Sequence, residues 1–230
     1  MGQRRERYGL FCTGGLNGTQ LKWIALITML IDHTAYMLLE PWSLLYLGMR
    51  LVGRLAFPLY CFLLVEGFVH TSDVNRYLGR LGLFALLSEL PFDWMNGRLS
   101  FQSQNVFFTL FLGLLALKGY VRLQNRNLPS FAYLWCVAMC ALAWFLRSDY
   151  GWAGVALICF LYRFRENALW KTVFGYGTLL IGVNMMEATA LASFLLMKWY
   201  NGKKGQTRLK WGFYLFYPLH ILVLAALRYI

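Results

Sequence analysis

Charged residues are scarce in this chain, and acidic residues are the scarcest. Only 14% of its 230 residues are charged, and just 10 are Asp or Glu. An ordinary globular domain has about 25% charged and about 45–50% apolar residues. Here 59% of the residues are hydrophobic, and no polar stretch is long enough to form a soluble domain. The composition therefore predicts an integral membrane protein without a working soluble part.

Cysteine is also sparse, and its spacing carries no metal-binding pattern. The 5 cysteines form no CxxC pair, and most of them lie inside apolar segments. Cys136 and Cys140 would share one helix face, but no His or acidic residue stands near them in the sequence. We therefore expect neither a zinc site nor any other metal site, and no disulfide framework.

The net charge of +12 has to be explained by something other than nucleic-acid binding. Basic chains often bind phosphate backbones. In this chain, however, Lys and Arg occur in short clusters between apolar runs, which is typical of cytoplasmic loops in membrane proteins. We expect membrane lipids around the chain and no nucleic-acid partner.

The apolar residues fall into nine segments. Crossing a bilayer takes roughly 20 apolar residues per helix, so the chain has room for about nine spans. We predict an all-α polytopic bundle in which residues 21–230 form a single transmembrane domain and residues 1–20 a basic cytoplasmic segment. The predicted spans are 21–39, 44–69, 76–94, 105–121, 128–146, 151–164, 169–185, 187–200 and 213–229.

The basic residues predict the orientation of these spans. If the N-terminus is cytoplasmic, most Lys and Arg residues fall on the cytoplasmic side. Because cytoplasmic loops are enriched in Lys and Arg, we expect the N-terminus inside, the C-terminus outside and an odd number of spans. The cytoplasmic segments would be 1–22, 70–80, 118–127, 163–171 and 198–210.

Several ionisable residues interrupt the apolar segments at a similar depth. An ionised side chain within the bilayer is unfavourable unless it is paired or hydrated. Ion pairs that only hold helices together need not lie at one depth in the membrane, whereas the residues that line one polar cavity do. The shared depth therefore favours a site in the outer half of the membrane. The residues are Asp32, His33, Arg50, Arg54, Glu89 and Asp93.

The histidines and arginines each allow two interpretations. His33 and His220 suit proton transfer near neutral pH, but either could equally be a hydrogen-bonded structural histidine. Arg50 and Arg54, at i and i+4, lie on one helix face. They could bind an anionic group such as a cofactor phosphate, or pair with acidic residues of other helices.

Four further residues have simpler explanations. Asn105, at the start of the fourth predicted span, is interpreted as a helix cap. Asp149 and Tyr150 stand between two predicted spans and indicate an ordinary interfacial turn. Pro91, between Glu89 and Asp93, predicts a kink or the end of its helix.

Six strings of the sequence closely resemble one known family. They are LKWIALITMLIDHTAYM, RLVGRLAFPLYCFLLVEGFVHT, YLGRLGLFALLSELPFDW, NVFFTLFLGLLAL, DYGWAGV and FYPLHILVL. The resemblance is to the TraX family, named for the conjugative F-pilin acetylase, and runs from about residue 20 to the C-terminus. It implies an acetyltransferase domain that uses acetyl-CoA, and a distant similarity to membrane acyltransferases of sugars and glycans.

The resemblance assigns His33 as the catalytic histidine, with Asp32 beside it. We expect Asp32 or Glu89 to orient its ring while His33 acts as a general base or forms an acyl intermediate. Arg50 and Arg54, with His220, would hold the acetyl-CoA donor or stabilise negative charge.

Asp93 and Asn105 would contact the acceptor, an amine or hydroxyl of a peptide such as a pilin N-terminus, or of a glycan. Two other hypotheses compete with this one. The same charges could serve a transporter or flippase, or the chain could be a non-enzymatic factor in pilus or secretion assembly. In every case we expect a multi-pass protein of the bacterial cytoplasmic membrane.

Overall fold

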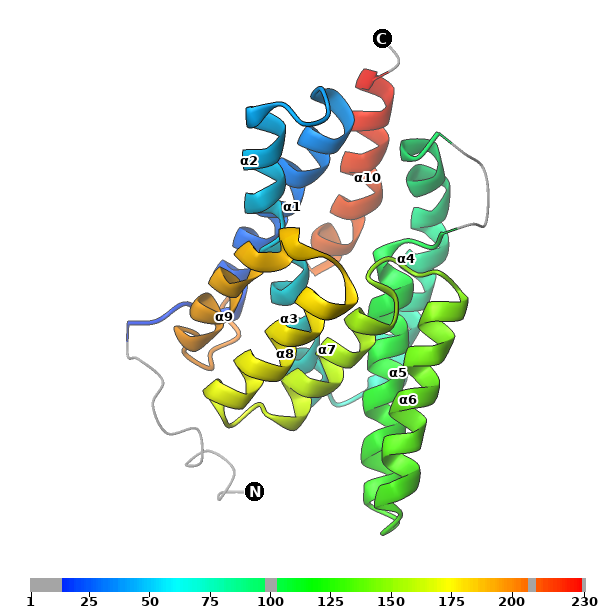
Figure 1. The fold of residues 1–230 in the computed structure, drawn as a ribbon. Coiled ribbons are helices and arrows are strands. Elements are labelled where there is room, and N and C mark those ends of the chain that lie inside the picture. The colour runs from blue at the N-terminus through cyan, green and yellow to red at the C-terminus, as the bar shows by residue number, and fades with distance from the viewer. Residues whose placement is uncertain (1–13, 98–102, 207–209, 229–230) are drawn as a thin grey trace.

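The computed structural model describes residues 14–97, 103–206 and 210–228, and these residues are almost entirely helical (Figure 1). Two isolated β-bridges occur in the described ranges, but no β-strand does. The predicted all-α fold class is thus confirmed. The helices are α1 Gly18–Leu38, α2 Leu44–Gly53, α3 Ala56–His70, α4 Val74–Met95, α5 Val106–Gln124, α6 Pro129–Phe145, α7 Gly151–Arg163, α8 Ala168–Gly182, the 3-10 helix η1 Met185–Ala190, α9 Leu191–Lys198 and α10 Lys210–Arg228.

Most of the predicted basic N-terminal segment 1–20 lies outside the described residues, as does Cys12. The predicted apolar segments otherwise match helices closely, with two refinements. The segment 44–69 is two helices, because the helix is interrupted at Arg54 and Leu55 between α2 and α3. The segment 187–200 starts within η1 and continues as α9. Pro91 does not end its helix, since α4 continues to Met95.

Polar side chains cap the starts of six helices, and the cap at Asn105 is the one that the sequence analysis predicts. At α1, the side chain of Asn17 accepts the backbone N–H of Gln20, while Gln20 accepts the backbone N–H of Asn17. This reciprocal pair is a capping box, which satisfies N–H groups that have no partner within the helix. At the starts of five other helices a side chain accepts one backbone N–H. These caps are Ser43 for α2, Asp73 for α4, Asn105 for α5, Asn167 for α8 and Asn184 for η1.

Helices α1 and α5 each pack against at least three other helices. Helix α1 packs against α2, α3 and α10, α10 packs against α4, and α5 packs against α3, α4, α6 and α7. The start of α1 is attached to the connection before α10, because the N–H of Gly18 donates to the carbonyl of Lys203 at 2.8 Å. Helices α1 and α10 therefore begin at a similar level and run side by side in the same direction (Figure 1).

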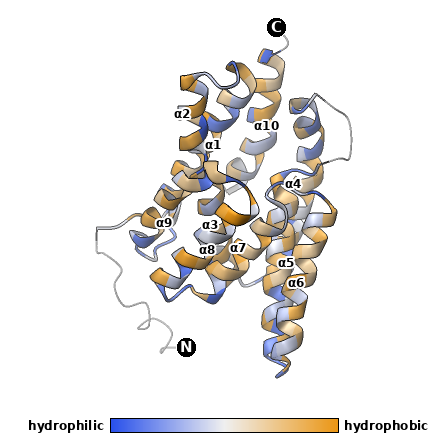
Figure 2. Ribbon diagram, viewed as in Figure 1, coloured by the Kyte–Doolittle hydropathy of each residue, from blue (hydrophilic) through white to orange (hydrophobic). Residues whose placement is uncertain are grey.

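The surface of the bundle is apolar, as expected for a membrane protein. Leu44 is 89% exposed and Ile181 is 83% exposed. Figure 2 shows hydrophobic residues along most of the helices and many hydrophilic ones near the turns. Four helical segments of the described chain are long and apolar enough to cross a membrane, namely Gly18–Leu38, Leu44–His70, Val106–Gln124 and Trp211–Arg228. The count of nine spans and the orientation of the termini stay predictions.

Several helices are too short to cross a bilayer alone. Helix α7 has 13 residues and α8 has 15, whereas a span takes roughly 20. Their neighbouring turns reach the level at which α2 passes into α3, about halfway up the bundle in Figure 1. This arrangement brings turns, with their polar groups, into the interior of the bundle.

The predicted orientation can be tested with reporter fusions. Alkaline phosphatase fused after the C-terminus should be active, since this enzyme folds only outside the cytoplasm. Green fluorescent protein fused there should be dark. Fusions in the turn between α5 and α6, after Asn125, should give the opposite pair of results because that turn is predicted to be cytoplasmic. A fluorescent C-terminal fusion would contradict the topology.

Candidate functional site

The centre of the site is a carboxylate held by two arginines. Oδ2 of Asp32, on α1, accepts a hydrogen bond from Nη1 of Arg50 at 2.6 Å. Nη2 of Arg54 lies 2.7 Å from both carboxylate oxygens of Asp32. Asp32 and Arg54 are buried, so these charge-assisted bonds form away from water. The structure therefore joins three of the predicted site residues.

A glycine allows the two helices to come this close. An ideal Cβ placed on Gly53 would lie 2.2 Å from Oδ1 of Asp32 and 2.3 Å from its Cβ. Real side chains do not approach so closely, so any residue other than glycine at this position would displace Asp32 or α2. Gly53 is also the last residue of α2, next to the break at Arg54.

Arg54 has a second carboxylate partner that the sequence analysis missed. Its Nη1 donates to Oε1 of Glu187 at 3.1 Å, and Glu187 is fully buried. The same nitrogen lies 3.4 Å from the hydroxyl of Tyr150. The predicted site already held three acids, Asp32, Glu89 and Asp93, against its two arginines, so its charge gave no signal for another acid. Glu187 is the acidic residue at the start of the predicted span 187–200, and only its position within an apolar segment could have indicated it.

The interpretation of Asp149 and Tyr150 as an ordinary interfacial turn needs correction. The ring of Tyr150 stacks on Phe57 of α3, with ring centroids 3.6 Å apart. Tyr150 has a φ of 61°, a left-handed conformation that is uncommon for residues other than glycine. This turn reaches into the bundle and contributes Tyr150 to the cluster around Arg54.

Two hydroxyl groups donate to backbone carbonyls on either side of the break between α2 and α3. The side chain of Thr189 donates to the carbonyl of Leu51 at 2.7 Å. The side chain of Ser193 donates to the carbonyl of Leu55 at 3.0 Å. Buried carbonyls without partners are unfavourable, so these bonds attach η1 and α9 to the break. They also fix the position of Glu187, which lies on η1.

The two predicted histidines meet next to this cluster. Nδ1 of His33 and Nε2 of His220 are 2.6 Å apart, and the rings are nearly parallel, at 7°. Nδ1 of His220 lies 2.6 Å from the carbonyl oxygen of Phe216. Because His33 follows Asp32 directly on α1, the histidine pair and the ion-pair cluster are neighbours in the sequence and in the fold.

Glu89 lies with Asn105 rather than with His33. The amide of Asn105 donates to Oε2 of Glu89 at 2.5 Å and to the carbonyl of Ala85 at 2.7 Å. The side-chain oxygen of Asn105 accepts the N–H of Phe107 at 3.0 Å, which confirms the predicted helix cap. Asp93 is buried further along α4. These contacts join α4 to the start of α5.

Aromatic rings connect this second polar group to the histidines. Tyr217 of α10 meets His33 edge to face, with ring centroids 6.0 Å apart, and it meets Phe107 at 5.2 Å. The N–H of Phe107 is the one capped by Asn105. The predicted site residues thus form two adjacent groups with aromatic packing between them, instead of a single cluster.

The fold and the site together define a class of protein: a helical membrane protein with buried ion pairs and paired histidines in its interior. A model of the TraX protein family matches residues 17–228, so the chain belongs to the TraX family. This confirms the resemblance seen in the sequence.

One similar protein is the "Probable fimbrial assembly protein FimC, serogroup H1" of Dichelobacter nodosus. It is 34% identical over 244 residues, which cover 91% of this chain and 94% of that protein. No solved structure matches the chain.

The close approach of Gly53 to Asp32 predicts that a larger residue at position 53 destabilises the protein. Gly53→Ala should lower the free energy of unfolding by about 1–3 kcal/mol, the usual effect of overpacking a tight contact. Thermal unfolding in detergent measures the difference. Gly48→Ala on the same helix is the matched control, because no atom lies within 4 Å of a Cβ placed there. If both variants unfold at the same temperature, α2 does not press on Asp32 as described.

Proposed function

We propose that this chain is a membrane-embedded acetyltransferase, which moves an acetyl group from acetyl-CoA to an amine or hydroxyl of a peptide or glycan. The observation that carries the proposal is the hydrogen-bonded chain from Phe216 through His220 to His33. Membership of the TraX family supports the reaction class, since the family is named for a pilin acetylase. The buried polar interior supports a reaction within the membrane.

The contacts of the two histidines favour one basic nitrogen on His33. A carbonyl oxygen only accepts, so Nδ1 of His220 carries a proton for the carbonyl of Phe216. In a neutral His220, Nε2 is then an acceptor, and Nδ1 of His33 must donate to it. This leaves the lone pair of His33 on Nε2. His33 is thereby held in the tautomer that a general base requires.

His33 would use this lone pair in both halves of the transfer. Nε2 removes a proton from the acceptor amine or hydroxyl as the acceptor attacks the thioester carbonyl. The carbon–sulfur bond then breaks, and the protonated Nε2 returns its proton to the departing thiolate. His220 accepts from Nδ1 throughout, and so steadies the ring while it carries positive charge.

The arginines suit charge stabilisation better than phosphate binding. Asp32 and Glu187 carry two negative charges against the two positive charges of Arg50 and Arg54, so the buried cluster is balanced. Nε of Arg50 is buried and has no hydrogen-bond partner within the described residues. That donor would be available to an oxyanion forming at the thioester carbonyl. The phosphates of acetyl-CoA then need another site.

In this proposal the second polar group acts on the acceptor side and not on the ring of His33. It consists of Glu89, Asp93 and Asn105. Asn105 is fully buried and occupied by its cap and by Glu89. It therefore positions Glu89 and the start of α5. Glu89 and Asp93 would supply negative charge where the acceptor enters, and this charge would favour an amine acceptor. The chain would work in the bacterial cytoplasmic membrane, with the acceptor outside.

A non-enzymatic role in fimbrial assembly is the second candidate. It is favoured by one observation, the name of the similar protein from Dichelobacter nodosus. An assembly factor would act through its surface and would have no need of a basic nitrogen at His33. Replacing His33 therefore distinguishes the acetyltransferase from the assembly factor.

Replacing His33 tests the proposal directly. His33→Ala should reduce acetyl transfer by about a hundredfold or more, the usual contribution of a general base. The purified variant should still bind acetyl-CoA like the unaltered protein, since His33 holds none of the donor in this account. An unchanged transfer rate would rule out the catalytic role, and normal assembly without any transfer activity would favour the assembly factor.

A pair of substitutions at His220 serves as the internal control. In His220→Phe the ring of His33 loses its acceptor, and kcat should fall while KM for acetyl-CoA stays the same. In His220→Gln the amide oxygen can still accept from Nδ1, so part of kcat should return. Equal losses in both variants would contradict the positioning role of His220.

A further inference from the structure

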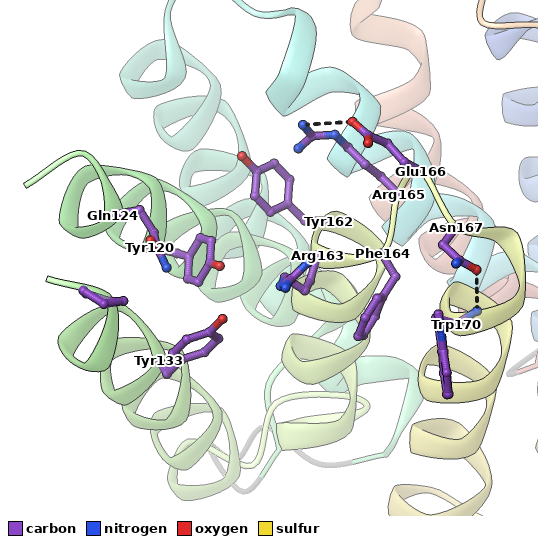
Figure 3. A pocket seen from close by; sticks show the side chains of 11 residues that line it. Tyr120, Gln124, Tyr133, Tyr162, Arg163, Phe164, Arg165, Glu166, Asn167 and Trp170 are labelled. Carbon is purple, nitrogen blue, oxygen red and sulfur yellow. Dashed lines mark hydrogen bonds and ion pairs between the residues drawn. The ribbon is translucent and has the colours of Figure 1, made fainter. Parts of the chain in front are cut away.

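A large pocket lies at the far end of α7 from the ion-pair cluster. It has a volume of about 680 Å³ and is formed where the turn between α7 and α8 faces the ends of α5 and α6 (Figure 3). Small-molecule sites usually measure about 300–1,000 Å³. None of the predicted site residues lines this pocket, so it is separate from the site described above.

Aromatic rings form one wall of the pocket. Tyr120 of α5 meets Tyr133 of α6 and Tyr162 of α7 edge to face, at centroid distances of 5.7 and 6.1 Å. Phe164 and Trp170 line the opposite side (Figure 3). Flat rings around an open space favour a flat aromatic ligand, which can stack on one ring and meet others at their edges.

Arginines supply positive charge on the same lining. Arg165 forms an ion pair with Glu166 at 3.7 Å, and these are neighbours in the turn. Arg163 forms no ion pair within the described ranges, and its guanidinium lies 5.6 Å from the centre of the Phe164 ring. The pocket thus carries more positive than negative charge, which favours an anionic ligand such as a phosphate.

The position of the pocket relates it to the candidate active site. Helix α7 begins next to Tyr150, in the cluster around Arg54, and ends at Arg163, in the pocket. Its 13 residues span about 20 Å at the usual rise per residue. An extended pantetheine arm covers a distance of that order. The basic residues also place this end of α7 on the predicted cytoplasmic side.

We propose that this pocket binds the adenine nucleotide of the acetyl donor, with the base among the tyrosines and the phosphates at Arg163 and Arg165. The proposal rests on the acetyltransferase function and extends it by naming where the donor is held. The headgroup of an anionic lipid offers the same phosphate chemistry but no flat ring, so the aromatic wall favours the nucleotide.

Binding of adenosine 3′,5′-bisphosphate to the purified full chain tests the pocket without any catalysis. The unaltered protein should bind it saturably, and Arg163→Gln should weaken binding about tenfold, as expected for one lost charge-assisted phosphate contact. Arg126→Gln is the matched control, because Arg126 lies in the adjacent turn but does not line the pocket. It removes the same charge and should leave the affinity unchanged.

Three results would overturn the assignment: no saturable binding, equal weakening by both substitutions, or equally strong competition by glycerol 3-phosphate, which would indicate a lipid headgroup. The kinetics of acetyl transfer test the nucleotide site independently of the binding measurement. Arg163→Gln should raise KM for acetyl-CoA but not for acetyl-pantetheine, which lacks the nucleotide. If the nucleotide binds as expected while no acetyl group is ever transferred, the acetyltransferase proposal fails and the nucleotide site stands.

Discussion

The contact of Asp32 with Arg50 and Arg54 is the interaction on which the rest of the site depends. It joins α1 to the end of α2 at a point where Gly53 removes the side chain that would keep them apart. It also leaves Arg54 with a nitrogen for Glu187, which attaches η1 to the same place. Removing one partner of a buried ion pair leaves an unpaired charge, which typically destabilises by about 3–5 kcal/mol.

The balance of charge in this cluster shapes the functional proposal. Because the arginines are neutralised by acids of the same chain, they are poor candidates for holding the phosphates of a donor. The histidines are different, since in the proposed tautomers the bonds of His33 and His220 run in one direction and leave Nε2 of His33 without a partner among the described residues. We therefore propose that His33 carries out the chemistry and that the nucleotide binds near Arg163, at the other end of α7.

Much of the fold could be predicted from the sequence because apolar length and polar caps act locally. The segment 105–121 and its cap at Asn105 both match α5. The partners of the charged residues could not be predicted in the same way. Whether Arg54 meets Glu187 or a ligand depends on how η1 docks on the break after Gly53, and that contact joins residues 133 positions apart. The turn at Tyr150 was misjudged for a related reason, because short helices place it inside the bundle.

A comparison of cell surfaces shows whether the chain transfers acetyl groups. Mass spectrometry of the surface peptides and glycans would be run on cells that produce the chain and on otherwise identical cells that lack it. If the chain is an acetyltransferase, at least one peptide amine or glycan hydroxyl should be acetylated only when the chain is present. Identical acetylation in the two samples would contradict this function.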